Sequence, residues 1–292
     1  MRKRQAPSED EQVAAYTQIL EAMAPRPVVF RVLDVGGDKI ASYMGMQKER
    51  NPFLGLRGIR YLLAHPDLFR TQVSAILRAG ARGTARLLLP MVSTLPELRE
   101  SRALVREVAA DLAARGVPHD PAPPLGVMVE VPSAVLMADE LAREADFLSV
   151  GSNDLVQYLL ALDRGNETVQ SLYEPQHPAV LRALQQTVDA GHRHGRRVSI
   201  CGEMAGDPLA VPLLLGMGFD RLSVSPALVP EIKSTIRALE LRECRALCRD
   251  ALEASDAEAV HALVENRLGS RFADLLALVR DAEPVAGRER GA

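Results

Sequence analysis

Short apolar runs alternate with helical segments along most of this 292-residue sequence. Each run is bounded by glycine, proline or polar residues, which predicts a buried strand, and residues at helical spacing fill the stretches between the runs. Because strand and helix alternate throughout, we expect a parallel sheet covered by helices. The expected strands are 28–33, 86–89, 125–131, 147–150, 198–201 and 221–224, with a short seventh near 54–59.

The near-continuous apolar character of these strands favours a (β/α)8 TIM-type barrel over a small open sheet. Such a barrel opens with a strand, whereas this sequence opens with a predicted helix at 12–23. We therefore predict a barrel that lacks its first strand. Its absence would leave the edges of strands 28–33 and 221–224 exposed.

The domain boundaries follow from the same pattern. We expect residues 1–240 to form the barrel, because strands are confined to this part of the chain. Residues 241–281 contain amphipathic helical segments and are predicted to be a C-terminal helical extension. The polar residues 282–292 are predicted to be a disordered tail.

Composition excludes several classes of partner. The formal net charge of −3 gives no general reason to expect nucleic acid or an anionic membrane surface, and the absence of tryptophan weakens any base-stacking role. We see no apolar run of membrane-spanning length and no signal peptide, so we expect no membrane insertion. Three cysteines do not make a disulfide framework, which favours a cytoplasmic protein.

The stretch 147–166, FLSVGSNDLVQYLLALDRGN, carries the strongest functional signal. An apolar strand stops at Gly151, and Ser152, Asn153 and Asp154 follow before a helical pattern begins. Polar groups at the carboxyl end of a parallel strand lie where ligands bind in α/β folds. The alternative is that Asn153 and Asp154 only cap the next helix.

Two carboxylates, Glu130 and Asp154, close neighbouring predicted strands. A small number of hard oxygen ligands suits Mg²⁺ or Mn²⁺, with substrate and water completing the coordination. The alternative is that each carboxylate pairs with an arginine.

Basic residues gather near the same predicted sheet edge. Arg31 interrupts the apolar strand VVFRVLD where we expect burial, Arg57 lies in NPFLGLRGIR, and Arg164 follows the central helix. Lys39, one of only four lysines, follows the Gly36–Gly37 pair. Fixed guanidinium groups beside a metal describe a site for a small phosphorylated carboxylate, although interior salt bridges would explain any one of them.

Cys201 ends a predicted strand. It is either a buried apolar thiol or a functional group, as a nucleophile or a proton donor.

The motifs FRVLDVGGDK, NPFLGLRGIR, GVMVEVPSA, GSNDLVQYLLALDRGN, CGEMAGD and LLLGMGFDRLSVSP resemble those of the C-terminal phosphoenolpyruvate-binding domain of enzyme I, the phosphoenolpyruvate–protein phosphotransferase family of the bacterial sugar phosphotransferase system. The resemblance extends over residues 11–239. It implies a phosphoenolpyruvate site that yields pyruvate, a homodimer, and transfer to a histidine-bearing phosphocarrier domain.

The resemblance also implies a role for each site residue. Arg31, Arg57 and Arg164 would hold the phosphoryl group, with Lys39 nearby and Asn153 binding through its amide. Glu130 and Asp154 would ligate Mg²⁺. Cys201 would protonate the enolate carbon. The physical reasoning agrees, because phosphoryl transfer depends on positioning and on neutralising oxygen charge.

Two departures from the family pattern are visible. Nothing here matches the phosphoryl-accepting histidine domain, and the first barrel strand with its arginine is missing. A fragment of a pyruvate phosphate dikinase or a phosphoenolpyruvate synthase is the second interpretation. A non-catalytic, truncated ligand-binding or dimerisation module is the third.

Overall fold

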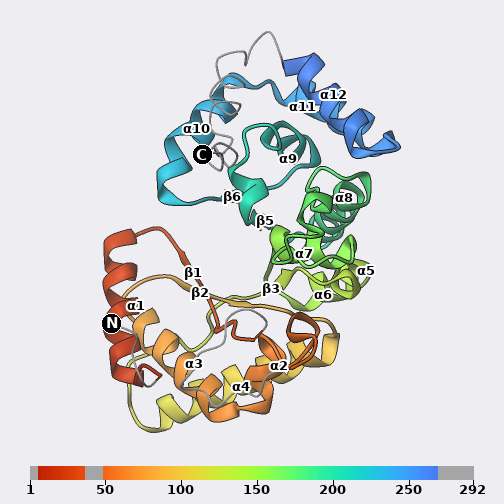
Figure 1. Ribbon diagram of the computed structural model, residues 1–292. Coiled ribbons are helices and arrows are strands. Elements are labelled where there is room, and N and C mark those ends of the chain that lie inside the picture. The colour runs from red at the N-terminus through yellow and green to blue at the C-terminus, as the bar shows by residue number, and fades with distance from the viewer. Residues whose placement is uncertain (1–5, 37–48, 269–292) are drawn as a thin grey trace, which may run out of the picture.

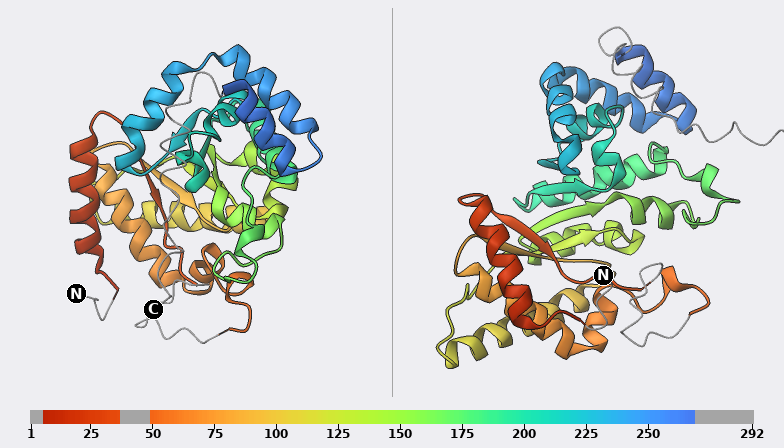
Figure 2. Two further views of the ribbon diagram at one scale, coloured as in Figure 1. Left: turned by 45° about the horizontal axis from the view of Figure 1, so that its top comes forward. Right: turned by 60° about the vertical axis from the view of Figure 1, so that its left-hand side comes forward.

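The computed structural model describes residues 6–36 and 49–268. In these residues six strands form one all-parallel sheet in the order β1-β2-β3-β4-β5-β6. The sheet is curled, and its helices are arranged around the strands (Figures 1 and 2). The strands are β1 (Val28–Arg31), β2 (Ala85–Leu89), β3 (Leu125–Val129), β4 (Phe147–Gly151), β5 (Val198–Cys201) and β6 (Arg221–Ser223).

Helices lie between successive strands, as strand–helix alternation predicts, while one α-helix precedes β1 and three α-helices follow β6 in the described residues. Four short 3-10 helices accompany them there. The α-helices are α1 (Glu9–Met23), α2 (Ile59–Ala64), α3 (Pro66–Gly80), α4 (Leu95–Ala114), α5 (Pro132–Leu136), α6 (Ala138–Glu144), α7 (Ser152–Leu159), α8 (Pro178–Arg193), α9 (Val211–Met217), α10 (Val229–Ala238), α11 (Leu241–Glu253) and α12 (Ala257–Leu268). The 3-10 helices are Pro52–Leu54, Gln170–Leu172, Glu203–Gly206 and Pro226–Leu228.

The two central strands show why this sheet is stable. Every residue of β3 and of β4 is buried, because helices cover one face and side chains of the curled sheet fill the other. Gly126 of β3 leaves space for the Phe147 side chain of β4, since a Cβ at position 126 would lie 2.3 Å from the Phe147 ring. One large core of buried hydrophobic residues extends between the sheet and its helices.

The short seventh strand expected at 54–59 is wrong. That segment contains the end of a 3-10 helix and a loop, and α2 begins at Ile59. The Gly58 amide does reach back to the Val35 carbonyl, at 3.1 Å, but this single contact does not extend into a strand.

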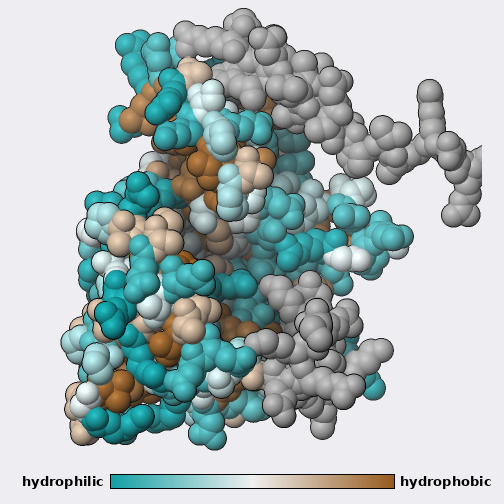
Figure 3. All heavy atoms as spheres, turned by 90° about the vertical axis from the view of Figure 1, so that its left-hand side faces the viewer, coloured by the Kyte–Doolittle hydropathy of each residue, from teal (hydrophilic) through white to brown (hydrophobic). Residues whose placement is uncertain are grey.

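Strands β1 and β6 form the two edges of the described sheet. Both edges border one cavity of about 800 Å³, which we call the trough. Figure 3 faces the side on which α1 lies, and hydrophobic residues are visible there between hydrophilic ones. Val29 of β1 remains 41% exposed, because the strand has a neighbour on one side only.

Helices α11 and α12 follow the last strand and pack against the body of the protein. Gly216 of α9 permits the close approach of α11, since a Cβ there would lie 2.2 Å from the Cys244 carbonyl oxygen. The predicted disordered tail, 282–292, lies outside the described residues. No helix in the described part of the chain is both long enough and apolar enough to cross a membrane.

Candidate active site at the carboxyl ends of the strands

Arg57 is the centre of the candidate site and is fully buried, with 0% exposure. It lies in the loop before α2, directly ahead of Gly58, whose φ of 56° suits glycine. Gly36 lies against Arg57 and has to lack a side chain, because a Cβ there would lie 2.9 Å from the Arg57 Cα. The two glycines therefore allow an arginine to be placed where its guanidinium is enclosed by protein.

The five N–H groups of Arg57 match five hydrogen bonds within the protein. Its Nε and Nη2 donate to Asp34 at 3.2 Å each, and its Nη1 and Nη2 donate to the two oxygens of Asp154 at 2.9 Å each. Nη1 also donates to the hydroxyl of Tyr158 at 3.3 Å, and that hydroxyl donates to the Phe53 carbonyl. Burial lowers the pKa of Arg57, but the bonds to Asp154 and Asp34 outweigh it, so the pKa lies above its ordinary value.

Arg31 joins this cluster from β1, where its Nη1 lies 3.2 Å from Asp34 Oδ2. The prediction that Arg31 is buried is wrong, because its side chain is 41% exposed. The reason is that β1 is an edge strand and Arg31 lines the open trough. Arg31 is therefore accessible to a ligand, whereas Arg57 is enclosed.

Glu130 follows β3 and is 1% exposed. One of its oxygens, Oε1, accepts the amide hydrogen of Met91 at 2.7 Å. Burial, and then the negative charge of Asp154, raise the pKa of Glu130 to about 8. Its other oxygen, Oε2, lies beside Gly151, where a Cβ would come within 2.4 Å of it.

Asn153 and Asp154 do not cap α7. The cap position is Gly151, which has no side-chain cap, and both residues lie in the first turn of the helix. Asn153 instead links to the next strand's exit loop: its Oδ1 accepts the Glu203 amide hydrogen at 2.9 Å, and its Nδ2 donates to Glu203 Oε1 at 3.2 Å. The interpretation of these residues as simple caps is therefore wrong.

A second cavity, of about 820 Å³, opens beside this cluster. Arg164 lines it together with Asn153, Glu203 and Tyr173. The Arg164 amide donates to Gln157 Oε1 at 3.1 Å, which fixes the backbone of its loop. Burial, and then the charge of Glu203, raise the pKa of Tyr173 to about 12, so its phenol is neutral and can donate a hydrogen bond.

Cys201 ends β5 and lines the trough. Its thiol donates to the Val150 carbonyl at 3.4 Å. Burial, and then the charge of Glu130, raise the pKa of the thiol, so the sulfur is protonated at neutral pH. A protonated thiol can donate a hydrogen bond or a proton, whereas the thiolate is the nucleophilic form.

Several predicted or missed residues complete the description. Lys39 lies outside the described residues. From the sequence, no role was assigned to Asp34, to Tyr158 or to the Met91 amide. Tyr158 lies in the central motif four residues after Asp154, one helical turn along, and that spacing was the available signal. The Met91 amide carried no signal, because any residue supplies one.

In the described ranges no group of three or more histidine, cysteine, aspartate or glutamate side chains is arranged to hold a metal ion.

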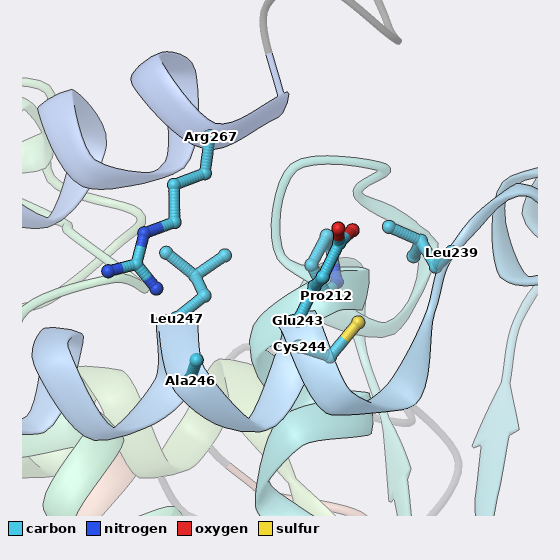
Figure 4. A pocket seen from close by; sticks show the side chains of 7 residues that line it. All are labelled: Pro212, Leu239, Glu243, Cys244, Ala246, Leu247 and Arg267. Carbon is cyan, nitrogen blue, oxygen red and sulfur yellow. The ribbon is translucent and has the colours of Figure 1, made fainter.

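A different pocket, of about 270 Å³, lies between α9, α11 and α12 (Figure 4). It contains none of the residues predicted to bind or react. Its lining residues are Pro212, Leu239, Glu243, Cys244, Ala246, Leu247 and Arg267.

Comparison with known families gives one match over most of the chain. The family described as "PEP-utilising enzyme, PEP-binding domain" matches residues 1–241. Among curated proteins, the phosphoenolpyruvate-protein phosphotransferase of Geobacillus stearothermophilus is 44% identical over 265 residues, which is 91% of this chain and 46% of the relative. The protein of the same name from Haemophilus influenzae is 44% identical over 92% of this chain and 47% of the relative. The chain thus spans about half the length of the curated relatives it matches.

Among solved structures, a malate synthase from Haloferax volcanii in a magnesium and glyoxylate complex is similar in fold. The TM-score is 0.52 at 13% identity, and the match covers 95% of this chain and 80% of that chain. At this identity the similarity bears on the fold alone.

Proposed function

Because this chain belongs to the family of phosphoenolpyruvate-binding domains of phosphoenolpyruvate-utilising enzymes, we propose that its carboxyl-end site binds phosphoenolpyruvate and takes part in phosphoryl transfer to protein. The observation that carries this proposal is the convergence of Arg31, Asp34, Arg57 and Asp154 in one hydrogen-bonded cluster. Fixed arginines and carboxylates at the ends of parallel strands are what a phosphorylated carboxylate and a divalent ion require.

The residues fit Mg²⁺, or Mn²⁺ in its place. The charge of Asp154 contributes to the raised pKa of Glu130, so the two carboxylates lie near each other, and Gly151 carries no side chain beside Glu130 Oε2. Both carboxylates offer hard oxygen ligands, and each Asp154 oxygen has a lone pair beyond the one it shares with Arg57. When bound, the ion would neutralise charge on the substrate's oxygens.

The three arginines differ in how easily a ligand can reach them. Arg57 has its donors engaged by Asp34 and Asp154, so it reaches a phosphoryl oxygen only by exchanging one of these partners. Arg31 and Arg164 line open cavities and meet the phosphoryl group directly, with Asn153 donating from its amide. Lys39 keeps its predicted place near the phosphate as part of this proposal.

Cys201 supplies the proton that ends the reaction. The bond from phosphorus to the enol oxygen breaks as the phosphoryl group moves to a histidine nitrogen of a phosphocarrier domain. The enolate carbon then takes the proton from Sγ, which gives pyruvate and a thiolate that solvent reprotonates. A neutral thiol is suited to this step.

The names of the relatives favour a phosphoenolpyruvate–protein phosphotransferase as the whole protein. We propose that it acts as a homodimer and passes the phosphoryl group to a histidine-bearing phosphocarrier domain. A fragment of a dikinase or of a phosphoenolpyruvate synthase is not favoured. For the fold, we propose a (β/α)8-type barrel. Six strands are described, so two further strands would have to close the sheet between β1 and β6, whose edges border the same trough.

Calorimetric titration of the full chain with phosphoenolpyruvate and Mg²⁺ tests the proposal. Wild type should bind, and Arg164→Met should weaken binding by about tenfold, the loss of one charge-assisted contact. Cys201→Ala should bind normally but fail to exchange the methyl protons of pyruvate with deuterium, followed by NMR, whereas Cys248→Ala should do both. Absence of binding in wild type would leave the non-catalytic module as the better interpretation.

A further inference from the structure

Three arginines line the trough at the end opposite to the candidate active site. Arg86 is the second residue of β2, Arg197 directly precedes β5, and Arg221 begins β6. All three border the same cavity. Because the strands are parallel, their amino ends lie together at one edge of the sheet and their carboxyl ends at the other.

These arginines have no anionic partner in the described part of the chain, unlike Arg57. Neither an ion pair nor a hydrogen bond to a carboxylate joins any of them to residues 6–36 or 49–268. The Nε of Arg86 is buried without an acceptor, and its guanidinium carbon lies 5.9 Å from the centre of the Phe147 ring. Burial, and then the charges of Arg221 and Arg197, lower the pKa of Arg86. The three positive charges are thus close enough to repel one another.

Asp220 is the acidic residue that lines the same cavity. Its Oδ2 already accepts the Val198 amide hydrogen at 2.8 Å and lies 3.1 Å from His192 Nε2. One carboxylate beside three guanidinium groups leaves an excess of two positive charges at this end of the trough. A ligand that matches this excess carries two negative charges.

We propose that the amino end of the trough is a second anion site, built by Arg86, Arg197 and Arg221, that binds a small dianion of the phosphate or phosphate-ester class. Guanidinium groups bind phosphate through paired N–H donors, and Arg86 is held in place by the aromatic ring beneath it. Arg197 and Arg221 are exposed, so a ligand exchanges with solvent. The site is separate from the phosphoenolpyruvate site, since a buried apolar cluster of Leu88, Met128 and Phe147 lies on the sheet between them.

The test is calorimetric titration of the full chain with inorganic phosphate, in the presence of EDTA, for three proteins. They are wild type, the double variant Arg197→Gln/Arg221→Gln, and the control Arg106→Gln. Arg106 is an exposed arginine on α4 outside the trough, so it reports any general effect of removing positive charge. Circular dichroism checks that each variant folds, which we expect because both trough positions are exposed, and each single variant repeats the measurement.

The double variant should bind one phosphate fewer per chain than wild type, or bind it at least about tenfold more weakly. Arg106→Gln should bind phosphate with the same stoichiometry and affinity as wild type. Titrations that are the same in all three proteins would overturn the proposal, as would an equal loss in Arg106→Gln. Arg164→Gln separates this result from the proposed function, because it should affect only phosphate bound at the carboxyl-end site. A chain that binds a single phosphate lost with Arg164→Gln alone would refute the second site and leave the first intact.

Discussion

The guanidinium of Arg57 grips both carboxylate oxygens of Asp154, with Nη1–Oδ1 and Nη2–Oδ2 distances of 2.9 Å. Asp34 holds the other edge of the same guanidinium at 3.2 Å. One buried cation therefore contacts two buried carboxylates, of which Asp34 also contacts Arg31. These charges stabilise one another, so any ligand that binds Arg57 or Asp154 has to exchange with contacts already made.

Arg57→Met should lower the free energy of unfolding by about 3–5 kcal/mol, because it removes the cation that binds both oxygens of the buried Asp154 and one of the cations beside the buried Asp34. Urea denaturation without substrate or metal measures the change. Arg115→Met is the matched control, since Arg115 pairs with Asp111 on the surface at 3.1 Å and should cost about 0–1 kcal/mol. Equal effects of the two substitutions would show that the buried cluster is not held by Arg57.

Gly151→Ala should weaken Mn²⁺ binding by at least about tenfold with only a modest loss of stability. The new methyl group would lie 2.4 Å from Glu130 Oε2, so the carboxylate must turn away from the site. The backbone at Gly151 has a φ of −90°, which alanine adopts without strain. Paramagnetic resonance of bound Mn²⁺ measures the affinity, and Glu130→Gln provides the reference for loss of this ligand. A Gly151→Ala protein that binds Mn²⁺ as wild type does would exclude Glu130 as a metal ligand.

Glu130 should make stability fall with rising pH when no metal is present. Its pKa is about 8 in the folded protein against an ordinary value of 4.5, so the folded state keeps a proton that the unfolded state has lost. The contribution of this group to the free energy of unfolding is therefore largest below pH 4.5 and decreases by roughly 5 kcal/mol up to about pH 8.

Urea denaturation across this pH range in EDTA, comparing wild type with Glu130→Gln, isolates that contribution. The difference in stability between the two proteins should change over this interval and level off above it. A difference in stability that stays constant over this pH range would mean that Glu130 in the folded protein is already ionised at the low end of the range.

The Cys201 thiol should react slowly with iodoacetamide at neutral pH. Its pKa is raised above the ordinary 9.0 by burial and by the charge of Glu130, and the thiolate is the reactive form. Mass spectrometry of the alkylated protein gives the rate at each pH, with free glutathione as the reference. The rate at pH 8 should be less than about one tenth of that of glutathione. Rapid labelling of Cys201 at pH 7 would identify an activated nucleophile instead of a proton donor.

The strands were predictable because their signal is local. Val28–Arg31 and Phe147–Gly151 are short apolar runs ended by polar residues or glycine, and both form strands. The segment 54–59 carries a similar apolar pattern but forms no strand. Its conformation depends on contacts with distant residues, such as the bond from Gly58 to Val35, that no local pattern reveals.

Most residues of the site could be predicted from the sequence, but the hydrogen bonds between them could not. The rule that polar residues at strand ends converge brought Arg57 and Asp154 together, although they are 97 residues apart. That rule does not state which donor takes which acceptor, so the complete engagement of Arg57 was not foreseen. The exposure of Arg31 was missed for a related reason, because burial of a strand residue depends on whether a neighbouring strand covers it.

In the described part of the chain β1 and β6 each pair with one other strand, and their open edges affect how the protein behaves when it is concentrated. Each edge presents amide and carbonyl groups that a neighbouring molecule can pair with, so copies can add to one another in an open-ended series. The positive charge of Arg221 on β6 opposes such stacking at low ionic strength, and dissolved salt screens that charge. The turbidity of a stored concentrated solution should therefore increase with salt concentration. For a protein that salt keeps in solution, turbidity would decrease instead.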